Sequence, residues 1–230
     1  MITPTILYED NHIIVAVKPA GVLSQAGELD LPDMLTLLKA YIKEKYSKPG
    51  NVFCGLVHRL DLNVGGIMVF ARTSKAASRL STQMANQQFH KNYYAVVQSM
   101  VPVGKEETLQ DYLYKDEFTR TAMLSTKELG KEALLMYRSI ANATYQNNLI
   151  SLLSIQLETG RFHQIRLQLA SRGMPIYADG KYGLKHQGDR EIGLYANQLT
   201  FSHPISQELM VFSSIPQTSV FCAFPVEVFL

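Results

Sequence analysis

The sequence predicts an α+β fold in which a bent, mainly antiparallel mixed sheet is flanked by a few helices. Segments rich in β-branched and aromatic residues outnumber segments with helical periodicity. Short turns join most of these segments, whereas parallel strands need long crossovers. With 230 residues, of which 47% are apolar and 18% charged, the chain is long enough to bury a core, and we expect one domain over residues 1–230.

The N-terminal region is predicted to form a hairpin and then a helix. Residues 6–8 and 13–17 are apolar and enclose a polar turn at residues 9–12. The helix is expected over residues 32–46, with Pro32 in its first turn, because apolar side chains recur there at helical spacing. This apolar stripe consists of Met34, Leu37, Leu38, Tyr41 and Ile42.

Two further helices are expected over residues 75–87 and 161–172. Thr73 or Ser74 supplies a capping hydroxyl for the first, and Gly173 suits the end of the second. Strands are predicted at residues 52–57, 67–71, 93–97, 112–114, 133–139, 149–157, 194–201 and 226–230.

The charge distribution carries more information than the net charge of +2. Residues 62–105 and residues 160–178 contain no Asp or Glu, although both stretches contain several Lys or Arg residues. Two interpretations stay open: the two stretches form two solvated basic faces, or they form the two sides of one groove that binds phosphates.

The chain shows no signature of export or membrane insertion. Its longest apolar runs are too short to span a bilayer, and the N-terminus lacks a secretory pattern. Cys54 and Cys222 lack the close spacing of a zinc or redox motif, so we expect free thiols. The sequence therefore predicts a cytoplasmic protein without a membrane partner.

The motif His-Arg-Leu-Asp at residues 58–61 places one carboxylate beside two basic side chains. Asp61 is the last acidic residue before Glu106. A carboxylate can act as nucleophile, base or metal ligand, but no second acid or Cys lies nearby at ligand spacing, and no metal site is expected. On its own, an Asp at a strand end is more often a turn or cap residue.

Two other segments carry candidate chemistry. His163 and Arg166 are i, i+3 neighbours in the predicted third helix, where Arg166 either pairs with Asp61 or lies in an ordinary surface ion pair. Tyr93 and Tyr94 point to opposite faces of a strand, so only one of them can line a given cleft.

Taken in order, six segments resemble the RluA-type pseudouridine synthases. They include a Lys-Pro-Ala-Gly turn, the His-Arg-Leu-Asp motif, a Lys-x-Tyr-x-Ala strand and a Gly-Arg-x-His-Gln-Ile-Arg helix, followed by an Ala-Asp-x-x-Tyr-Gly loop and a late His-Pro. These segments lie at residues 18–21, 58–61, 91–95, 160–166, 178–183 and 203–204. Each motif alone is weak evidence for the family, so the resemblance depends on finding all six in the same order.

The resemblance implies a fold with a central catalytic cleft and an enzyme that converts uridine to pseudouridine in transfer or ribosomal RNA, without cofactor or metal. Asp61 becomes the catalytic aspartate, Arg166 its ion-pair partner and Tyr93 the aromatic residue that lines the uracil pocket. The substrate-binding residues expected from the motifs are Lys18, His58, Arg59, Arg161, His163 and Gln164.

The chain departs from the family pattern at Val64-Gly65, Phe162 and Gln168, which affects the fine shape of the site. The chain begins with the catalytic domain, so we expect that domain to recognise the RNA by itself, as a monomer. One alternative is a catalytically inactive RNA-binding relative. Another, a glycosidase, needs a second carboxylate, for which Asp179 is the one candidate.

Overall fold

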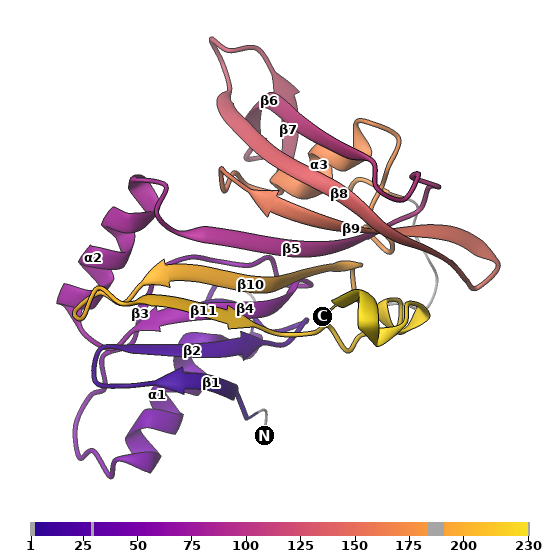
Figure 1. The fold of residues 1–230 in the computed structure, drawn as a ribbon. Coiled ribbons are helices and arrows are strands. Elements are labelled where there is room, and N and C mark those ends of the chain that lie inside the picture. Colours follow the sequence, from indigo (N-terminus) through magenta and orange to yellow (C-terminus); the bar gives the residue numbers. More distant parts are fainter. Residues whose placement is uncertain (1–2, 29, 184–190, 230) are drawn as a thin grey trace. The chain divides into compact units, whose positions relative to one another are not determined.

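The computed structural model describes residues 3–28, 30–183 and 191–229, which form two compact units. The first unit comprises Met1–His90 and Asn197–Ser214, and the second comprises Lys91–Ala196 and Ile215–Leu230. Each unit is built on antiparallel strand pairs with helices added to them, as the α+β prediction required (Figure 1).

The first unit contains the predicted N-terminal hairpin, β1 (Thr5–Glu9) with β2 (Ile13–Lys18). β2 pairs with β4 (Gly65–Ala71), all of whose residues are buried. The strand order continues to β10 (Leu194–Ser202), which pairs with β11 (Leu209–Ser213), while the short β3 (Gly55–Leu56) pairs with β4.

Two helices accompany these strands. α1 (Met34–Lys45) begins after Asp33, whose carboxylate accepts the Thr36 N–H at 3.0 Å, so Pro32 precedes the helix instead of lying in its first turn as predicted. α2 (Ser74–Ala85) is capped by Thr73, which confirms that prediction. The core of the first unit consists of Ile13, Val15, Ile67, Val69, Ala71, Ala76, Leu80, Phe89, Leu199 and Phe201.

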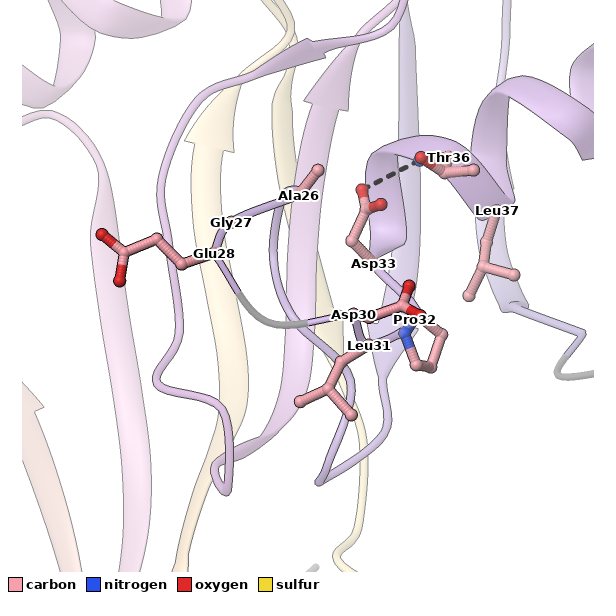
Figure 2. A pocket seen from close by; sticks show the side chains of 9 residues that line it. All are labelled: Ala26, Gly27, Glu28, Asp30, Leu31, Pro32, Asp33, Thr36 and Leu37. Atoms are coloured by element: carbon pink, nitrogen blue, oxygen red, sulfur yellow. Dashed lines mark hydrogen bonds between the residues drawn. The ribbon is translucent and has the colours of Figure 1, made fainter.

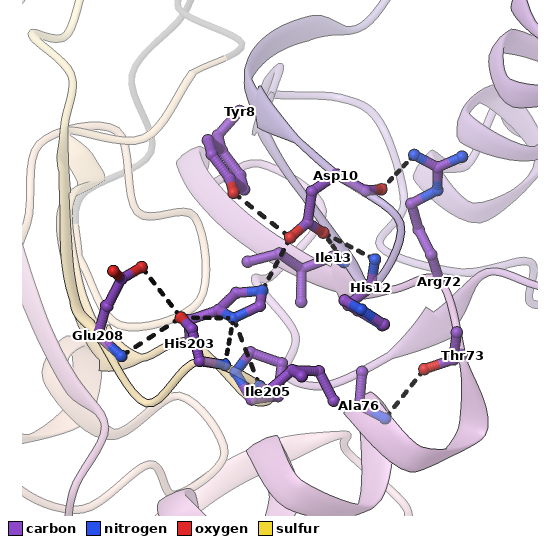
Figure 3. A network of polar contacts seen from close by, with 12 residues as sticks. Tyr8, Asp10, His12, Ile13, Arg72, Thr73, Ala76, His203, Ile205 and Glu208 are labelled. Atoms are coloured by element: carbon purple, nitrogen blue, oxygen red, sulfur yellow. Dashed lines mark hydrogen bonds and ion pairs between the residues drawn. The ribbon is translucent and has the colours of Figure 1, made fainter.

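A polar network joins the two hairpin turns of the first unit (Figure 3). The Asp10 carboxylate accepts the backbone N–H groups of His12 and Ile13, both at 2.7 Å. His203 Nε2 lies 2.8 Å from the same carboxylate, and His203 Nδ1 accepts the Ser206 N–H at 3.0 Å. The late His-Pro motif therefore links the turn after β1 to the turn after β10.

The second unit contains an antiparallel sheet in the order β5-β9-β8-β6-β7, in which every neighbouring pair is antiparallel. Its strands are β5 (His90–Val97), β6 (Glu106–Asp116), β7 (Thr121–Ser125), β8 (Lys131–Tyr145) and β9 (Asn148–Leu157). The short helix α3 (Gln164–Ala170) packs on β6 and β7.

Several sequence predictions for the two units were wrong in detail. α3 is shorter than predicted because His163 has a left-handed backbone, with φ of 50°, which helical residues do not adopt. Gly173 ends the helical region with φ of 71°, as predicted. The predicted C-terminal strand is instead a 3₁₀ turn, Val226–Phe229, and Leu230 lies outside the described residues. The strands β7 and β11 were not predicted.

In the described part of the chain, none of the helices combines the length and the apolar character needed to cross a bilayer.

Candidate active site

The loop that carries Asp61 lies between β3 and β4 and is anchored on its N-terminal side by Ser24. The Ser24 hydroxyl donates to the Leu60 carbonyl at 2.9 Å and accepts the Leu60 N–H at 3.1 Å. Leu60 is 8% exposed, so these two contacts replace water at its backbone. The residue immediately before Asp61 is therefore held in one position.

Lys18 anchors the same loop on the other side of Asp61. Its ammonium is completely buried and donates to the carbonyls of Pro19, Val22 and Leu62 at 3.0, 2.6 and 3.0 Å. The Leu62 carbonyl also accepts the Gly21 N–H at 2.9 Å. Asp61 thus lies between two residues with immobilised backbones, and the Val64 N–H closes the turn on its carbonyl at 3.1 Å.

The buried position of Lys18 has an electrostatic consequence. Burial lowers the pKa of Lys18 to about 7, against the attraction of the Asp61 carboxylate, which favours the ammonium form. The Lys18 side chain has no exposed surface, so its contacts favour a role in positioning the loop over direct contact with RNA.

His58 and Arg59 point to different environments. His58 is buried, its Nε2 accepts the Val69 N–H at 3.2 Å, and its ring lies against Phe89 with centroids 5.5 Å apart. These contacts attach the loop to β4 and to the core. Arg59 is exposed and can reach a ligand from the loop.

In the second unit, Arg166 on α3 forms a bidentate ion pair with Asp179. Its Nε donates to Oδ2 at 2.9 Å and its Nη2 to Oδ1 at 2.7 Å. The carboxylate, which is fully buried, also accepts the N–H groups of Lys181 and Tyr182 at 3.0 and 3.3 Å. Burial alone raises the pKa of Asp179, but Arg166 and these N–H donors outweigh it and hold the pKa below its ordinary value.

Tyr182 connects Arg166 to His163. The Arg166 guanidinium lies over the Tyr182 ring at 5.3 Å from the centroid, and the Tyr182 hydroxyl is 2.9 Å from His163 Nδ1. The Ala122 N–H donates to the same hydroxyl at 2.5 Å. His163 and Arg166 therefore contact one side chain, as their predicted common face suggested, although His163 precedes the helix.

Arg161 lies in the turn before α3, and Gln164 is the first residue of that helix. Gln164 is 3% exposed, and its Oε1 accepts from the Thr159 hydroxyl at 2.8 Å and from the Arg161 N–H at 3.0 Å. Arg161 is exposed, with its Nε donating to the Glu132 carbonyl at 2.7 Å. The contacts of Gln164 hold the turn together, whereas Arg161 presents charge at the surface.

Tyr93 and Tyr94 lie on opposite faces of β5, as predicted. Tyr93 is 6% exposed and shares its face with Lys91 and Ala95. Tyr94 packs edge-on against Phe229, with centroids 5.1 Å apart, and its hydroxyl is 3.5 Å from the Phe229 carbonyl. Tyr94 is therefore part of the packing of the C-terminal turn.

The pocket shown in Figure 2 lies at the start of α1 and contains none of the predicted site residues. Three acids, Glu28, Asp30 and Asp33, are among its lining residues, and the Asp33 carboxylate caps α1. Negative charge at this place is unsuited to a polyanionic ligand.

Sequence reasoning missed three contributors to these arrangements: Ser24, Tyr182, and Asp179 as the partner of Arg166. Tyr182 and Asp179 were visible as parts of the Ala-Asp-x-x-Tyr-Gly loop, although the motif did not say what they contact. Ser24 carried no signal, because its contact with Leu60 spans 36 residues.

The chain is similar to known proteins over most of its length. A family model described as RNA pseudouridylate synthase matches residues 12–171. A Pasteurella multocida protein named dual-specificity RNA pseudouridine synthase RluA is 33% identical over 92% of each chain. A Xylella fastidiosa ribosomal large subunit pseudouridine synthase D is 34% identical over 87% of this chain and 62% of its own length.

A solved structure supports the same fold. The structure titled human RNA pseudouridylate synthase domain containing 1 matches with a TM-score of 0.76, covering 93% of this chain and 84% of that one. Its sequence identity is 20%, so this likeness concerns the fold, which agrees with the predicted α+β architecture.

Proposed function

The chain belongs to the RNA pseudouridylate synthase family, and from this membership we propose that it converts uridine to pseudouridine in transfer or ribosomal RNA with Asp61 as the catalytic carboxylate. The observation that carries the assignment is the double anchoring of the Asp61 loop, by Ser24 at Leu60 and by Lys18 at Leu62. Hydrogen bonds on both sides fix the backbone around this carboxylate, and a catalytic group held in one orientation reacts faster with a bound substrate.

The reaction breaks the C–N glycosidic bond and forms a C–C bond between the same base and ribose. The proton lost from C5 of uracil is matched by a proton taken up at N1, and the oxidation state is unchanged, so the proposal requires no cofactor. Three first steps are consistent with an ionised carboxylate: addition of Asp61 to uracil, addition to the ribose, or removal of a sugar proton.

We further propose that Arg166 pairs with Asp61 in the active enzyme and that Tyr93 stacks on the uracil. The ion pair with Asp179 orients the guanidinium through two of its N–H groups, and one arginine can donate to more than one carboxylate. Such a pair favours the ionised form of Asp61, and a phenol on the base can assist the later proton transfer.

The predicted substrate-binding residues divide by exposure. Arg59 and Arg161 are exposed, which suits contact with RNA phosphates. Lys18, His58 and Gln164 are buried and hydrogen-bonded to backbone or neighbouring side chains, which favours positioning roles. His163, held by Tyr182, lies beside Arg166 on the same unit. Cytoplasmic location, a single catalytic domain and a monomeric state remain predictions of the sequence.

Asp61→Asn tests the assignment, because it removes the charge and keeps the shape. We expect no tritium release from RNA labelled at C5 of uridine, with RNA binding retained. Asp30→Asn, at an exposed acid near the start of α1, is the matched control and should keep wild-type turnover. Turnover by Asp61→Asn would refute the role of Asp61. RNA binding without turnover by the wild-type protein on any cellular RNA would favour a non-catalytic relative.

A further inference from the structure

Lys91 lies near the start of β5 and directs its ammonium toward the turn that follows β9. A Cβ placed on Gly160 would lie 3.0 Å from Lys91 Nζ, so the absence of a side chain at Gly160 makes room for the ammonium. Lys91 pairs with Leu157 across the two strands, which places its side chain near the end of β9. Lys91 therefore supplies a cation beside the turn at Gly160, where no side chain blocks access to it.

Among the described residues, no group neutralises the charge of Lys91. In residues 3–28, 30–183 and 191–229, Lys91 Nζ takes part in no ion pair and no hydrogen bond. Burial lowers the pKa of Lys91. A partly desolvated ammonium without a counter-charge costs free energy, so a residue of this kind is typical of a binding site.

Other lysines show the usual arrangement. The fully buried Lys18 donates to three carbonyls, whereas Lys45 and Lys105 pair at the surface with Glu9 and Glu107. Lys91 combines partial burial with no counter-charge in the described part of the chain, which points to an anion from outside the protein.

The position of Lys91 relative to Tyr93 indicates which anion. Residues two apart on a strand share a face, and β5 pairs Lys91 with Leu157 and Tyr93 with Ile155 on the same side of the sheet. The rise of a strand separates their Cα atoms by about 7 Å. A nucleotide whose base lies at Tyr93 therefore has its own backbone within reach of a long lysine side chain.

We propose that Lys91 and Gly160 form a subsite for a backbone phosphate of the RNA, next to the nucleotide that Tyr93 contacts. The subsite rests on the proposed function, since that function supplies the RNA and the role of Tyr93. Lys91 neutralises one phosphate as the target nucleotide leaves its stack, and this contact offsets part of the cost of unstacking. Gly160 keeps the approach open.

Lys91→Met tests the charge. For binding to an unmodified transfer RNA transcript, we expect about 10-fold weaker affinity and a salt slope reduced by about 1, as for the loss of one phosphate contact. Lys105→Gln is the control, because Glu107 already neutralises that lysine. An unchanged slope for Lys91→Met would overturn the subsite. If Lys91→Met does not fold, Lys91→Gln is measured by the same criteria.

Gly160→Ala tests the geometry without changing the charge. The added methyl group meets the end of a flexible side chain, so it should displace the ammonium and weaken binding while the fold is kept. Wild-type affinity for Gly160→Ala would contradict the proposed approach of the phosphate.

Replacing single RNA phosphates with neutral methylphosphonates identifies the phosphate that Lys91 binds. The replacements are made one at a time around a uridine that the enzyme converts. At one position, the replacement should weaken binding by the wild-type protein but cause no further loss of binding by Lys91→Met. Equal effects on both proteins at every position would overturn the subsite. The subsite is tested by RNA affinity, whereas the proposed function is tested by tritium release by wild-type protein and Asp61→Asn. A failure of the subsite can therefore be told apart from a failure of the proposed function.

Discussion

Arg166 and Asp179 are joined by two parallel contacts, and the carboxylate of this pair is completely buried. The pair lies within one unit and links α3 to the loop that follows it. Arg166 is therefore oriented by the protein itself before any substrate is bound, and Asp179 acts as its positioning residue.

Asp179→Asn should destabilise the protein by about 3 kcal/mol, because removing one partner leaves a mostly buried guanidinium without its counter-charge. The measurement is urea unfolding. Glu106→Gln is the control, since the pair of Glu106 with Arg138 is exposed and should contribute at most about 1 kcal/mol. We also expect a lower kcat with little change in RNA affinity, and equal losses in both variants would argue against the pairing.

Acid should weaken the same pair. The pKa of Asp179 lies below its ordinary value of 3.8, so the unfolded chain takes up a proton at this residue before the folded protein does. The stabilising contribution is complete well above pH 3.8 and is lost as the pH falls through the folded-state pKa. The difference in unfolding free energy between wild-type protein and Asp179→Asn should shrink over that range, and a constant difference would contradict the assignment.

Lys18→Met should destabilise the Asp61 loop by about 1–3 kcal/mol, because three carbonyls lose their donor. Between about pH 7 and 10.5, the unfolded chain binds one proton more than the folded protein at Lys18. The unfolding free energy of the wild type should therefore rise with pH relative to Lys18→Met. Parallel pH profiles for the two proteins would show that the pKa of Lys18 is not lowered in the folded protein.

Ser24→Ala should lower kcat by about 10–100-fold while RNA affinity changes little, because Leu60 loses both contacts that hold it beside Asp61. The appropriate measurement is single-turnover kinetics with a separate binding assay. Ser78→Ala, at an exposed position of α2, is the matched control. A rate for Ser24→Ala equal to that of the control would show that the anchoring is dispensable.

Tyr93→Phe keeps an aromatic ring and removes the hydroxyl. If the phenol assists proton transfer, kcat should fall by roughly 100-fold or more with RNA affinity kept. Tyr94→Phe is the control, since Tyr94 packs on Phe229 from the other face of β5. Equal activity of both variants would limit Tyr93 to stacking.

Local features of the fold were predictable from the sequence because they depend on neighbouring residues. The hairpin of β1 and β2, the cap at Thr73 and the stop at Gly173 each follow from a few adjacent side chains. β7 was missed because its five residues lack a clear alternation, and the start of α3 was misplaced because nothing in the sequence marks His163 as left-handed.

The site was predictable in its residue types and less so in its contacts. The motifs identified Asp61 and Arg166 as candidate residues. The ion pair of Arg166 with Asp179 depends on the path of the loop between them, which the sequence does not specify. The contact of Ser24 with Leu60 forms only when the first unit is folded. The pairing of Asp61 with Arg166 stays a prediction, which a double-mutant cycle on these two residues can measure.

The first unit is made from two separate stretches of chain, and its core includes Leu199 and Phe201 as well as residues from its N-terminal part. Phe201 stacks on Phe89, which in turn touches His58 of the Asp61 loop. During translation, the ribosome must therefore release almost the whole polypeptide before this core can close. A nascent chain halted in the second unit would carry the His-Arg-Leu-Asp loop before Phe201 is available to stack on Phe89 beneath it, with part of the apolar core still uncovered.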